Sequence, residues 1–217
     1  MSIIIYQMTV AKYLNNATVK TSTKFHRTIF TSDIIFTKAD TYTSDEKVEK
    51  LTRWFNIHCR ACIGSLIYLL STRVYLSFSV HKSAKFSSNP AKVHFKGLVY
   101  QLRYIRDNKT LGLQYYADIN DTPLSGLLRQ TSINNKNQLM VLYDYSWKDC
   151  PDTGRSTGAY LIFYQGGPID HGTYVPGTVA QSSAESGYNA SGTAGMDSAH
   201  FRMLINELLN NDTDMVS

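Results

Sequence analysis

The 217-residue sequence predicts an α/β chain of the mixed α+β kind, and three observations lead to that prediction. Residues 45–110 carry apolar side chains at the spacing of helix faces. Residues 111–175 hold several short runs typical of strands, separated by polar segments that contain Gly or Pro. A long helical stretch follows. Strands in succession next to helices indicate an α+β or α/β architecture, and the length suits one or two domains able to bury a core.

The composition excludes several classes of protein. Hydrophobic residues make up 43% and charged residues 18%, the balance of a globular chain rather than a disordered one. The longest apolar candidate, Ile63–Leu70, is far shorter than the roughly 18 residues that span a bilayer, so we expect no membrane partner. The N-terminus lacks the charged and long apolar regions of a secretory signal. We therefore expect a chain that is not secreted and works in the cytoplasm or nucleus.

Residues 45–110 are predicted to be mainly helical, whereas residues 1–44 form a poorly determined N-terminal segment. In that segment two runs, SIIIY and TIFTSDIIF, resemble strands, and Lys38–Ser44 has the composition of a loop. Three later stretches have helical composition or apolar spacing: Glu46–Phe55, Cys62–Ser71 and Ala91–Arg106. Val74–His81, which lies between the last two, alternates only loosely between apolar and other residues.

Residues 111–217 are predicted to form strands and then one helix. Four runs are typical of strands: Leu111–Ala117, Gln138–Tyr145, Ala159–Gln165 and Gly172–Val175. The helix is expected after Ser182 and Ser183, as far as Leu209. One of the two serines is the expected N-cap, and Glu185 lies in the first turn, where the helix dipole favours an acid.

Two patterns that suggest enzymatic or metal chemistry have simpler explanations. Cys59 and Cys62 form one C-x-x-C, but no second pair and no H-x-x-x-H stands at zinc spacing. Two thiols on a helix explain this pair better than a metal or redox site. The serines and histidines of the C-terminal half lack the G-x-S-x-G of a serine hydrolase.

A basic stretch supplies the candidate nucleic-acid-binding residues. The net charge is only +5, but residues 82–109 hold seven Lys and Arg against one acid, Asp107. On the helix predicted over Ala91–Arg106, four of them are predicted to share a face: Lys92, Lys96, Arg103 and Arg106. A helix with one basic and one apolar face can pack on a core and lie along phosphates. The alternative is an ordinary solvated helix surface.

Asp144 is the candidate catalytic and metal-binding residue. It ends an apolar strand and precedes a polar loop and a second strand, the arrangement in which metal-dependent nucleases present their first carboxylate ligand. The alternative is an aspartate that initiates a turn. That alternative is the better explanation for Asp149, Asp152 and Asp170, which are predicted to lie in loops.

Two stretches of the sequence resemble one family. The run CRACIGSLIYLLSTRVYLSFSVHKSAKFSSNPAKVHFKGLVYQLRYIRDNKTLGLQYY is similar to the segment that links reverse transcriptase to RNase H in copia-type LTR retrotransposon Pol polyproteins. The runs YDYSWKDCPDTGRSTGAYLIFYQGGPI and TVAQSSAESGYNA resemble the first three strands and first helix of the RNase H domain in those polyproteins. The match extends from about Thr37 to the end of the chain, with several motifs in order at the family spacing.

The resemblance implies a reverse transcriptase connection over residues 45–110 and a truncated RNase H-like domain over residues 111–217. The implied fold is a five-stranded mixed sheet flanked by helices, which cuts the RNA strand of RNA–DNA hybrids. That chemistry uses about four carboxylates to hold two Mg²⁺ ions, and Asp144 takes the place of the first. The implied partners are RNA–DNA hybrid or another nucleic acid, and the remainder of a Pol polyprotein.

Several family positions differ in this sequence. Gly187 stands where the family has its catalytic Glu, and Glu185 lies about 200° away around a helix. The remaining family aspartates lie beyond Ser217. Tyr75 replaces a family Asp, and Asp197 is expected to be an unpaired carboxylate within the apolar stripe of the last helix, which is destabilising. We therefore expect a catalytically inactive site that binds Mg²⁺ poorly.

Three hypotheses for function follow from these residues. The first is an inactive fragment of a copia-type Pol polyprotein. The second is a module that holds RNA–DNA hybrid or RNA without cutting it, with binding that falls steeply as salt rises. The third is a pseudogene product that has no function and folds poorly.

Overall fold

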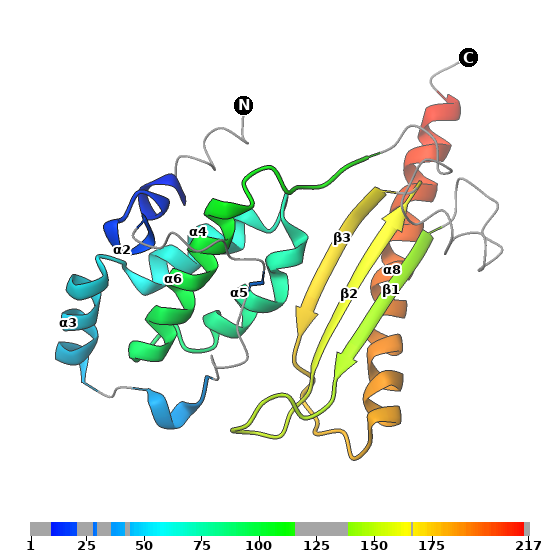
Figure 1. The fold of residues 1–217 in the computed structure, drawn as a ribbon. Helices are drawn as coiled ribbons and strands as arrows, with labels where there is room; N and C mark the ends of the chain where they lie inside the picture. The colour runs from blue at the N-terminus through cyan, green and yellow to red at the C-terminus, as the bar shows by residue number, and fades with distance from the viewer. Residues whose placement is uncertain are drawn as a thin grey trace. The chain divides into compact units, whose positions relative to one another are not determined.

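The computed structural model describes residues 10–20, 28–29, 36–41, 44–115, 139–165 and 167–214. The chain divides into two compact units, Met1–Gly112 and Leu113–Ser217. The first unit is helical, and the second combines a sheet with one long helix (Figure 1). The mixed α+β class predicted from the sequence is therefore confirmed. In the described part of the chain, no helix is both long enough and apolar enough to cross a membrane.

Helices of the first unit follow the apolar spacing of the sequence. Its elements are α2 (Ala17–Lys20), the 3-10 helix η1 (Lys38–Asp40), α3 (Asp45–Phe55), α4 (Cys59–Leu69), the 3-10 helix η2 (Val74–Leu76), α5 (Ser77–Ala84) and α6 (Lys92–Asp107). The three predicted helices correspond to α3, α4 and α6. Asn56 ends α3 in the left-handed conformation, with φ of 51°, a common way for a helix to stop.

Two segments of this unit contain helices that the sequence did not predict. The loosely alternating Val74–His81 is helical, because Leu76 and Val80 lie one turn apart and both are buried in the core. The predicted loop Lys38–Ser44 contains the short helix η1. The strands predicted over SIIIY and TIFTSDIIF lie outside the described residues, except for three positions that are not in strands.

The core of the first unit is built around α6. The ring of Phe95 stacks on Phe55 of α3 with centroids 5.3 Å apart. Val10, Tyr13 and Val19 are buried in the same core, so residues 10–20 pack with the helices that follow them. The side-chain amide of Asn16 donates to the main-chain oxygens of Phe55 and Asn56, which fastens this N-terminal part to the end of α3.

The second unit contains a three-stranded antiparallel sheet in the order β1-β2-β3. The strands are β1 (Leu139–Ser146), β2 (Thr157–Tyr164) and β3 (Gly167–Tyr174), and the helix is α8 (Ser183–Asp214). Strand β3 begins five residues earlier than predicted. The sequence indicated no strand there because Pro168 and Asp170 are poor strand formers, but pairing with β2 outweighs this local preference. Asp170 therefore lies in a strand and not in a loop. The predicted strand Leu111–Ala117 is wrong for residues 111–115, which pair with no described strand.

Helix α8 covers one face of the sheet. Its small buried residues Ala190 and Ala194 let it approach closely, and it packs more on β1 than on β2. Leu139 and Val141 of β1 line a groove together with α8 and therefore mark the covered face. Because side chains alternate along a strand, the residues between them face the other way.

Candidate functional site

One strip of the surface of helix α6 carries two exposed lysines. Lys92 and Lys96 are exposed, Tyr100 and Arg103 are half-buried, and we call these four residues the α6 strip. Lys92 and Lys96 make no ion pair with the described residues, whereas Lys50 and Arg53 of α3 pair with Glu46 and Glu49. Burial lowers the pKa of Arg103, the nearby Arg106 lowers it further, and Asp107 opposes both effects.

Arg106, the fourth predicted member of this face, points elsewhere. Its guanidinium donates to the main-chain oxygen of Val19 over 2.7 Å and to the Asp107 carboxylate over 2.7 Å. The sequence held a signal for this, because Arg106 follows the buried Leu102 by four residues and therefore lies on the apolar side of the helix. Lys92, Lys96 and Arg103 therefore lie on one surface, whereas the side chain of Arg106 bonds to Val19 and Asp107.

The two tyrosines of α6 differ in their surroundings. Tyr104 is buried and its ring packs edge-on against Tyr75, with centroids 6.2 Å apart. Tyr100 is half-buried on the α6 strip, four residues after Lys96. Of the two, only Tyr100 is placed where a base could stack on it, beside cations able to contact phosphates.

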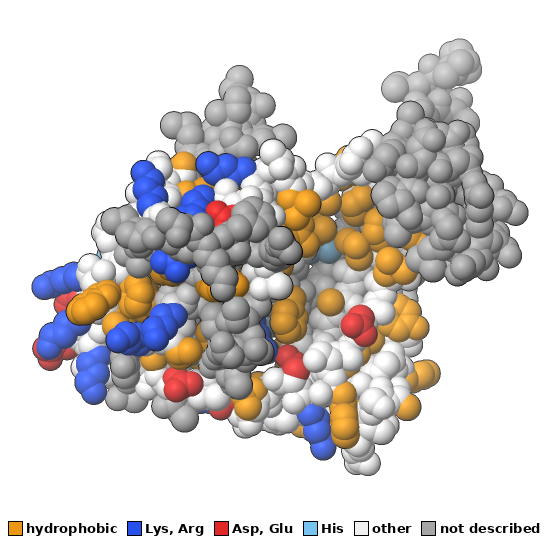
Figure 2. All heavy atoms as spheres, viewed as in Figure 1, with side chains coloured by type: hydrophobic (Ala, Val, Ile, Leu, Met, Phe, Trp, Pro, Cys, Tyr) orange, Lys and Arg blue, Asp and Glu red, His pale blue; other side chains and the backbone are white. Residues whose placement is uncertain are grey.

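The boundary between the units separates charges of opposite sign. Met1–Gly112 contains 17 Lys and Arg against 6 Asp and Glu, a net charge of +11. Leu113–Ser217 contains 5 against 11, a net charge of −6. Figure 2 shows the Lys and Arg side chains gathered over the helices of the first unit. The modest total of +5 therefore conceals a strongly basic unit, which attracts polyanions, and an acidic unit, which repels them.

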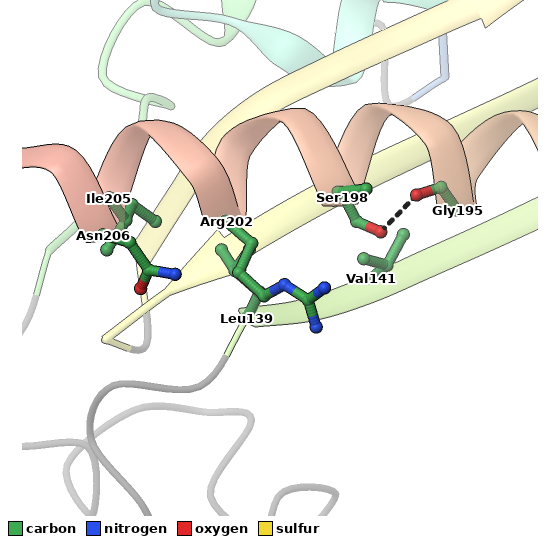
Figure 3. Close-up of a pocket in the computed structure, with 8 residues that line it drawn as sticks. Leu139, Val141, Gly195, Ser198, Arg202, Ile205 and Asn206 are labelled. Carbon is green, nitrogen blue, oxygen red and sulfur yellow. Dashed lines mark hydrogen bonds between the residues drawn. The ribbon is translucent and has the colours of Figure 1, made fainter.

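Asp144 lies near the end of β1 and is exposed to solvent. Its Oδ1 accepts a hydrogen bond from the Tyr145 N–H over 2.8 Å, and it is paired with Ala159 of β2. By alternation from Val141, which lies on the side of α8 (Figure 3), its side chain lies on the sheet face opposite α8. Gly187 lies in the first turns of α8, which covers the other face of the sheet, and a Cβ added there would meet no heavy atom within 4 Å. The two positions thus belong to opposite faces.

The acids near β1 and at the start of α8 have structural partners. Thr157 donates to the two carboxylate oxygens of Asp149 over 2.8 and 2.9 Å, which holds the β1–β2 loop. Ser182 is the N-cap of α8, as expected, since its Oγ accepts the N–H of Glu185 over 3.1 Å. The Glu185 carboxylate accepts the N–H of Gln181. Among the described residues, no group of three or more His, Cys, Asp and Glu can hold a metal ion, so the donor set does not fit two Mg²⁺ ions.

Asp170 of β3 and Asp197 of α8 share one partner, the Tyr160 hydroxyl, which the spacing of residues along the sequence could not reveal. The hydroxyl of Tyr160 donates to Oδ2 of Asp170 over 3.0 Å and also hydrogen-bonds to Asp197. Burial raises the pKa of Tyr160, and the two carboxylates raise it further. The expectation that Asp197 is an unpaired carboxylate was wrong, because a hydroxyl two elements away in sequence reaches it.

The C-x-x-C pair lies inside the helical core. Cys59 and Cys62 are both buried in α4. Burial raises the pKa of the Cys59 thiol to about 12 against an opposing effect of Arg60. Burial also raises the pKa of Cys62 strongly, with a further increase from Cys59 and an opposing effect of Lys12. Reactive and metal-binding cysteines need an accessible thiolate, which is the opposite of this environment.

Three known proteins are similar to this chain. Secreted RxLR effector protein 161 of Plasmopara viticola is 28% identical over 62% of this chain and 84% of that protein. The retrovirus-related Pol polyprotein from transposon RE1 of Arabidopsis thaliana is 26% identical over 69% of this chain and 9% of the polyprotein. An uncharacterized mitochondrial protein of Arabidopsis thaliana is 27% identical over 60% of this chain and 48% of that protein.

The chain thus corresponds to under a tenth of the polyprotein and about half of the mitochondrial protein. No family model and no solved structure matches it. The similarity to the transposon RE1 polyprotein supports a relationship to the Pol region of transposons.

Proposed function

We propose that this chain is a fragment of a copia-type retrotransposon Pol polyprotein, comprising the reverse transcriptase connection and part of the RNase H region. The fragment binds RNA–DNA hybrid or related nucleic acid and does not cut it. Similarity to a transposon Pol polyprotein and the copia-type motifs around Ile63 and Asp144 support the origin. The order of the elements, helices first and then three antiparallel strands and a helix, is compatible with that assignment.

The charge partition carries the binding part of the proposal. The first unit has a net charge of +11, and its α6 strip presents Lys92 and Lys96 with no acid paired to them among the described residues. Each phosphate that a lysine neutralises releases counterions, which stabilises the complex and makes it sensitive to salt. We place the nucleic acid on the first unit for this reason.

The positions of Asp144 and Gly187 support the absence of cleavage. A two-metal nuclease needs several carboxylates around one point, so that two cations can bind both the attacking and the leaving oxygen. Asp144 points away from α8, whereas Gly187, the position where the family has its Glu, lies on α8 over the other face of the sheet. A Glu placed at residue 187 would therefore not complete a site around Asp144.

Cleavage is tested with a labelled RNA–DNA hybrid and the purified chain in Mg²⁺ and in Mn²⁺. We expect no cleavage by the wild type, by Asp144→Asn or by Gly187→Glu. Cleavage that disappears in Asp144→Asn would contradict the proposal, because it would show a complete catalytic site.

Binding is tested on the same hybrid by fluorescence anisotropy over a range of salt concentrations. The variant Lys92→Gln/Lys96→Gln removes two cations of the α6 strip. The negative slope of log affinity against log salt concentration should therefore become less steep by about 2. The control Lys148→Gln/Arg155→Gln removes the same charge from the second unit and should leave the slope unchanged. Equal effects of the two double variants would show that the total charge, and not the α6 strip, determines binding.

A further inference from the structure

The segment that follows α6 is held by one side chain from the turn before η2. The guanidinium of Arg73 donates through Nη1 to the main-chain oxygen of Asn108 over 2.9 Å, and through Nη2 to that of Lys109 over 2.5 Å. The carbonyl groups at the end of a helix lack partners within that helix, and a charged donor makes stronger hydrogen bonds than a neutral one. Arg73 therefore fastens the end of α6 to a part of the chain 35 residues earlier.

The hydroxyl of Tyr75 extends this contact to Leu111. It accepts a hydrogen bond from Nη1 of Arg73 over 2.7 Å and donates one to the Leu111 oxygen over 3.3 Å. The Asp of the copia-type motif could accept from Arg73, but when ionised it could not donate to a carbonyl. The Tyr75 ring also packs edge-on against the buried Tyr104 of α6. We call Arg73 and Tyr75 the exit clamp.

Hydrogen bonds, and not burial, hold residues 108–111 on the first unit. The side chains of Lys109, Thr110 and Leu111 are exposed, so little apolar surface is removed from water there. The Leu111 N–H donates to the Asn108 oxygen over 3.2 Å, which closes a turn. The exit clamp thus supplies the contacts that join this turn to the preceding helices.

Tyr115 is held in a similar way, but on the second unit. Its hydroxyl donates to the main-chain oxygen of Pro168 in β3 over 2.8 Å. Its ring lies against Gly167, where an added Cβ would collide with the ring. Leu111 and Tyr115 are therefore fixed to different units, although only three residues separate them.

These three residues, 112–114, carry no such contacts. Within the described part of the chain they make no hydrogen bond, and a Cβ added at Gly112 would meet no heavy atom within 4 Å. Glycine adopts a wide range of main-chain conformations, and hinges between rigid bodies are commonly a few loop residues that absorb the change in φ and ψ. The boundary between the two units follows Gly112.

We propose that residues 112–114 form a hinge between the two units, and that the exit clamp and Tyr115 set its two ends. Residues 108–111 then move with the first unit and Tyr115 moves with the second, while rotation occurs about the main chain of the three residues between them. The hinge does not depend on the nucleic-acid function proposed for the first unit.

The test is backbone nitrogen-15 relaxation of the full chain by NMR. We expect order parameters near those of a rigid backbone, about 0.85, from α6 through Leu111. They should fall below about 0.6 at residues 112–114 and rise again at Tyr115.

Variants of the exit clamp should move one end of the hinge. Arg73→Gln should extend the low order parameters back to Asn108, because two carbonyl groups lose their charged donor. Tyr75→Phe removes only the hydroxyl and should lower the order parameter at Leu111. Arg60→Gln, which removes an exposed cation from α4, is the matched control and should leave all of these values unchanged.

Trypsin gives a second measurement that separates local release from general loosening. The bond after the exposed Lys109 should be cut about tenfold faster in Arg73→Gln than in the wild type, because cleavage requires local opening of the chain. The bond after Lys96, inside α6, should be cut at an unchanged rate.

Four results would overturn the proposal. High order parameters throughout residues 112–114 would show that the chain has no hinge there. Low values from Asn108 onward in the wild type would show that the exit clamp does not hold. Identical profiles for Arg73→Gln and Arg60→Gln would remove the role of Arg73. Equal acceleration of cleavage after Lys96 and Lys109 would show that the whole first unit has loosened.

Discussion

The guanidinium of Arg106 donates a hydrogen bond to the main-chain oxygen of Val19 over 2.7 Å. Val19 is the penultimate residue of α2, and the last carbonyl groups of a helix have no partner within that helix. Arg106 supplies the missing donor and joins the end of α6 to the N-terminal part of the core. Arg106, which the sequence predicts to contact phosphates, is thus also part of the packing of the first unit.

This arrangement predicts that Arg106→Gln and Lys92→Gln have different effects. Loss of the Arg106 contacts leaves a carbonyl and a carboxylate poorly satisfied, so the free energy of unfolding should fall by about 1–3 kcal/mol. Lys92 is exposed and its change should alter stability by less than about 0.5 kcal/mol. Urea denaturation followed by circular dichroism measures both. Equal stability of the two variants, with weaker hybrid binding by Arg106→Gln, would place Arg106 at the interface.

Glycines inside α8 are predicted to lower its stability. A Cβ at Gly192 meets no heavy atom within 4 Å, so Gly192→Ala should raise the free energy of unfolding by about 1 kcal/mol. Gly158 of β2 provides the contrast, because a Cβ there would lie 2.7 Å from the ring of Tyr174. Gly158→Ala should therefore be destabilising. Thermal unfolding of both variants tests this, and a gain in stability for Gly158→Ala would contradict the packing of the tyrosines against β2.

The three cysteines should differ in reactivity. Cys59 and Cys62 are buried with raised pKa values, so little thiolate is present and reagents reach it slowly. Cys150 is half-buried and should react first. Titration of the native chain with dithiobis-nitrobenzoate at pH 8 should modify one thiol quickly, and the other two only after denaturant is added. Cys150→Ser should remove the fast phase, and a fast phase that survives this change would show that α4 exposes its thiols.

His94 should make stability depend on pH below its ordinary pKa. Burial lowers the pKa of His94 to about 4, against a smaller opposing effect of the Asp40 carboxylate. Its Nδ1 accepts the N–H of Ala91 over 2.8 Å, which also favours the neutral ring. Well above pH 6.5 the ring is neutral in both the folded and the unfolded chain, and protonation of His94 does not lower the free energy of unfolding. As pH falls from 6.5 to 4 the unfolded chain binds a proton that the folded chain does not, so stability falls.

The loss from His94 should reach up to roughly 3 kcal/mol near pH 4. It is measured by urea denaturation at several pH values, with His94→Gln as the comparison. The variant retains the contributions of other titrating groups but lacks this one, so its stability should fall less between pH 6.5 and pH 4. Parallel curves for the two proteins would show that His94 is protonated in the folded state.

The sequence by itself determined those elements in which local spacing and burial agree. The stripe of Leu98 and Leu102 predicted α6, the spacing of Ile63 and Leu66 predicted α4, and the apolar run of β2 predicted a strand. The charges of the α6 strip could also be found in this way, because residues four apart lie on one side of a helix whatever surrounds it.

Only the tertiary structure decided the features that depend on partners distant in sequence. Strand β3 forms over Pro168 and Asp170 because β2 offers a full set of main-chain partners. Asp197 and Arg106 became internal groups because the Tyr160 hydroxyl and the Val19 carbonyl reach them from other elements. Spacing along one element shows which side a residue occupies. Whether that side contacts solvent, a carboxylate or a carbonyl depends on how the elements pack together. For this reason only the folded chain shows that Asp144 and Gly187 lie on opposite faces of the sheet.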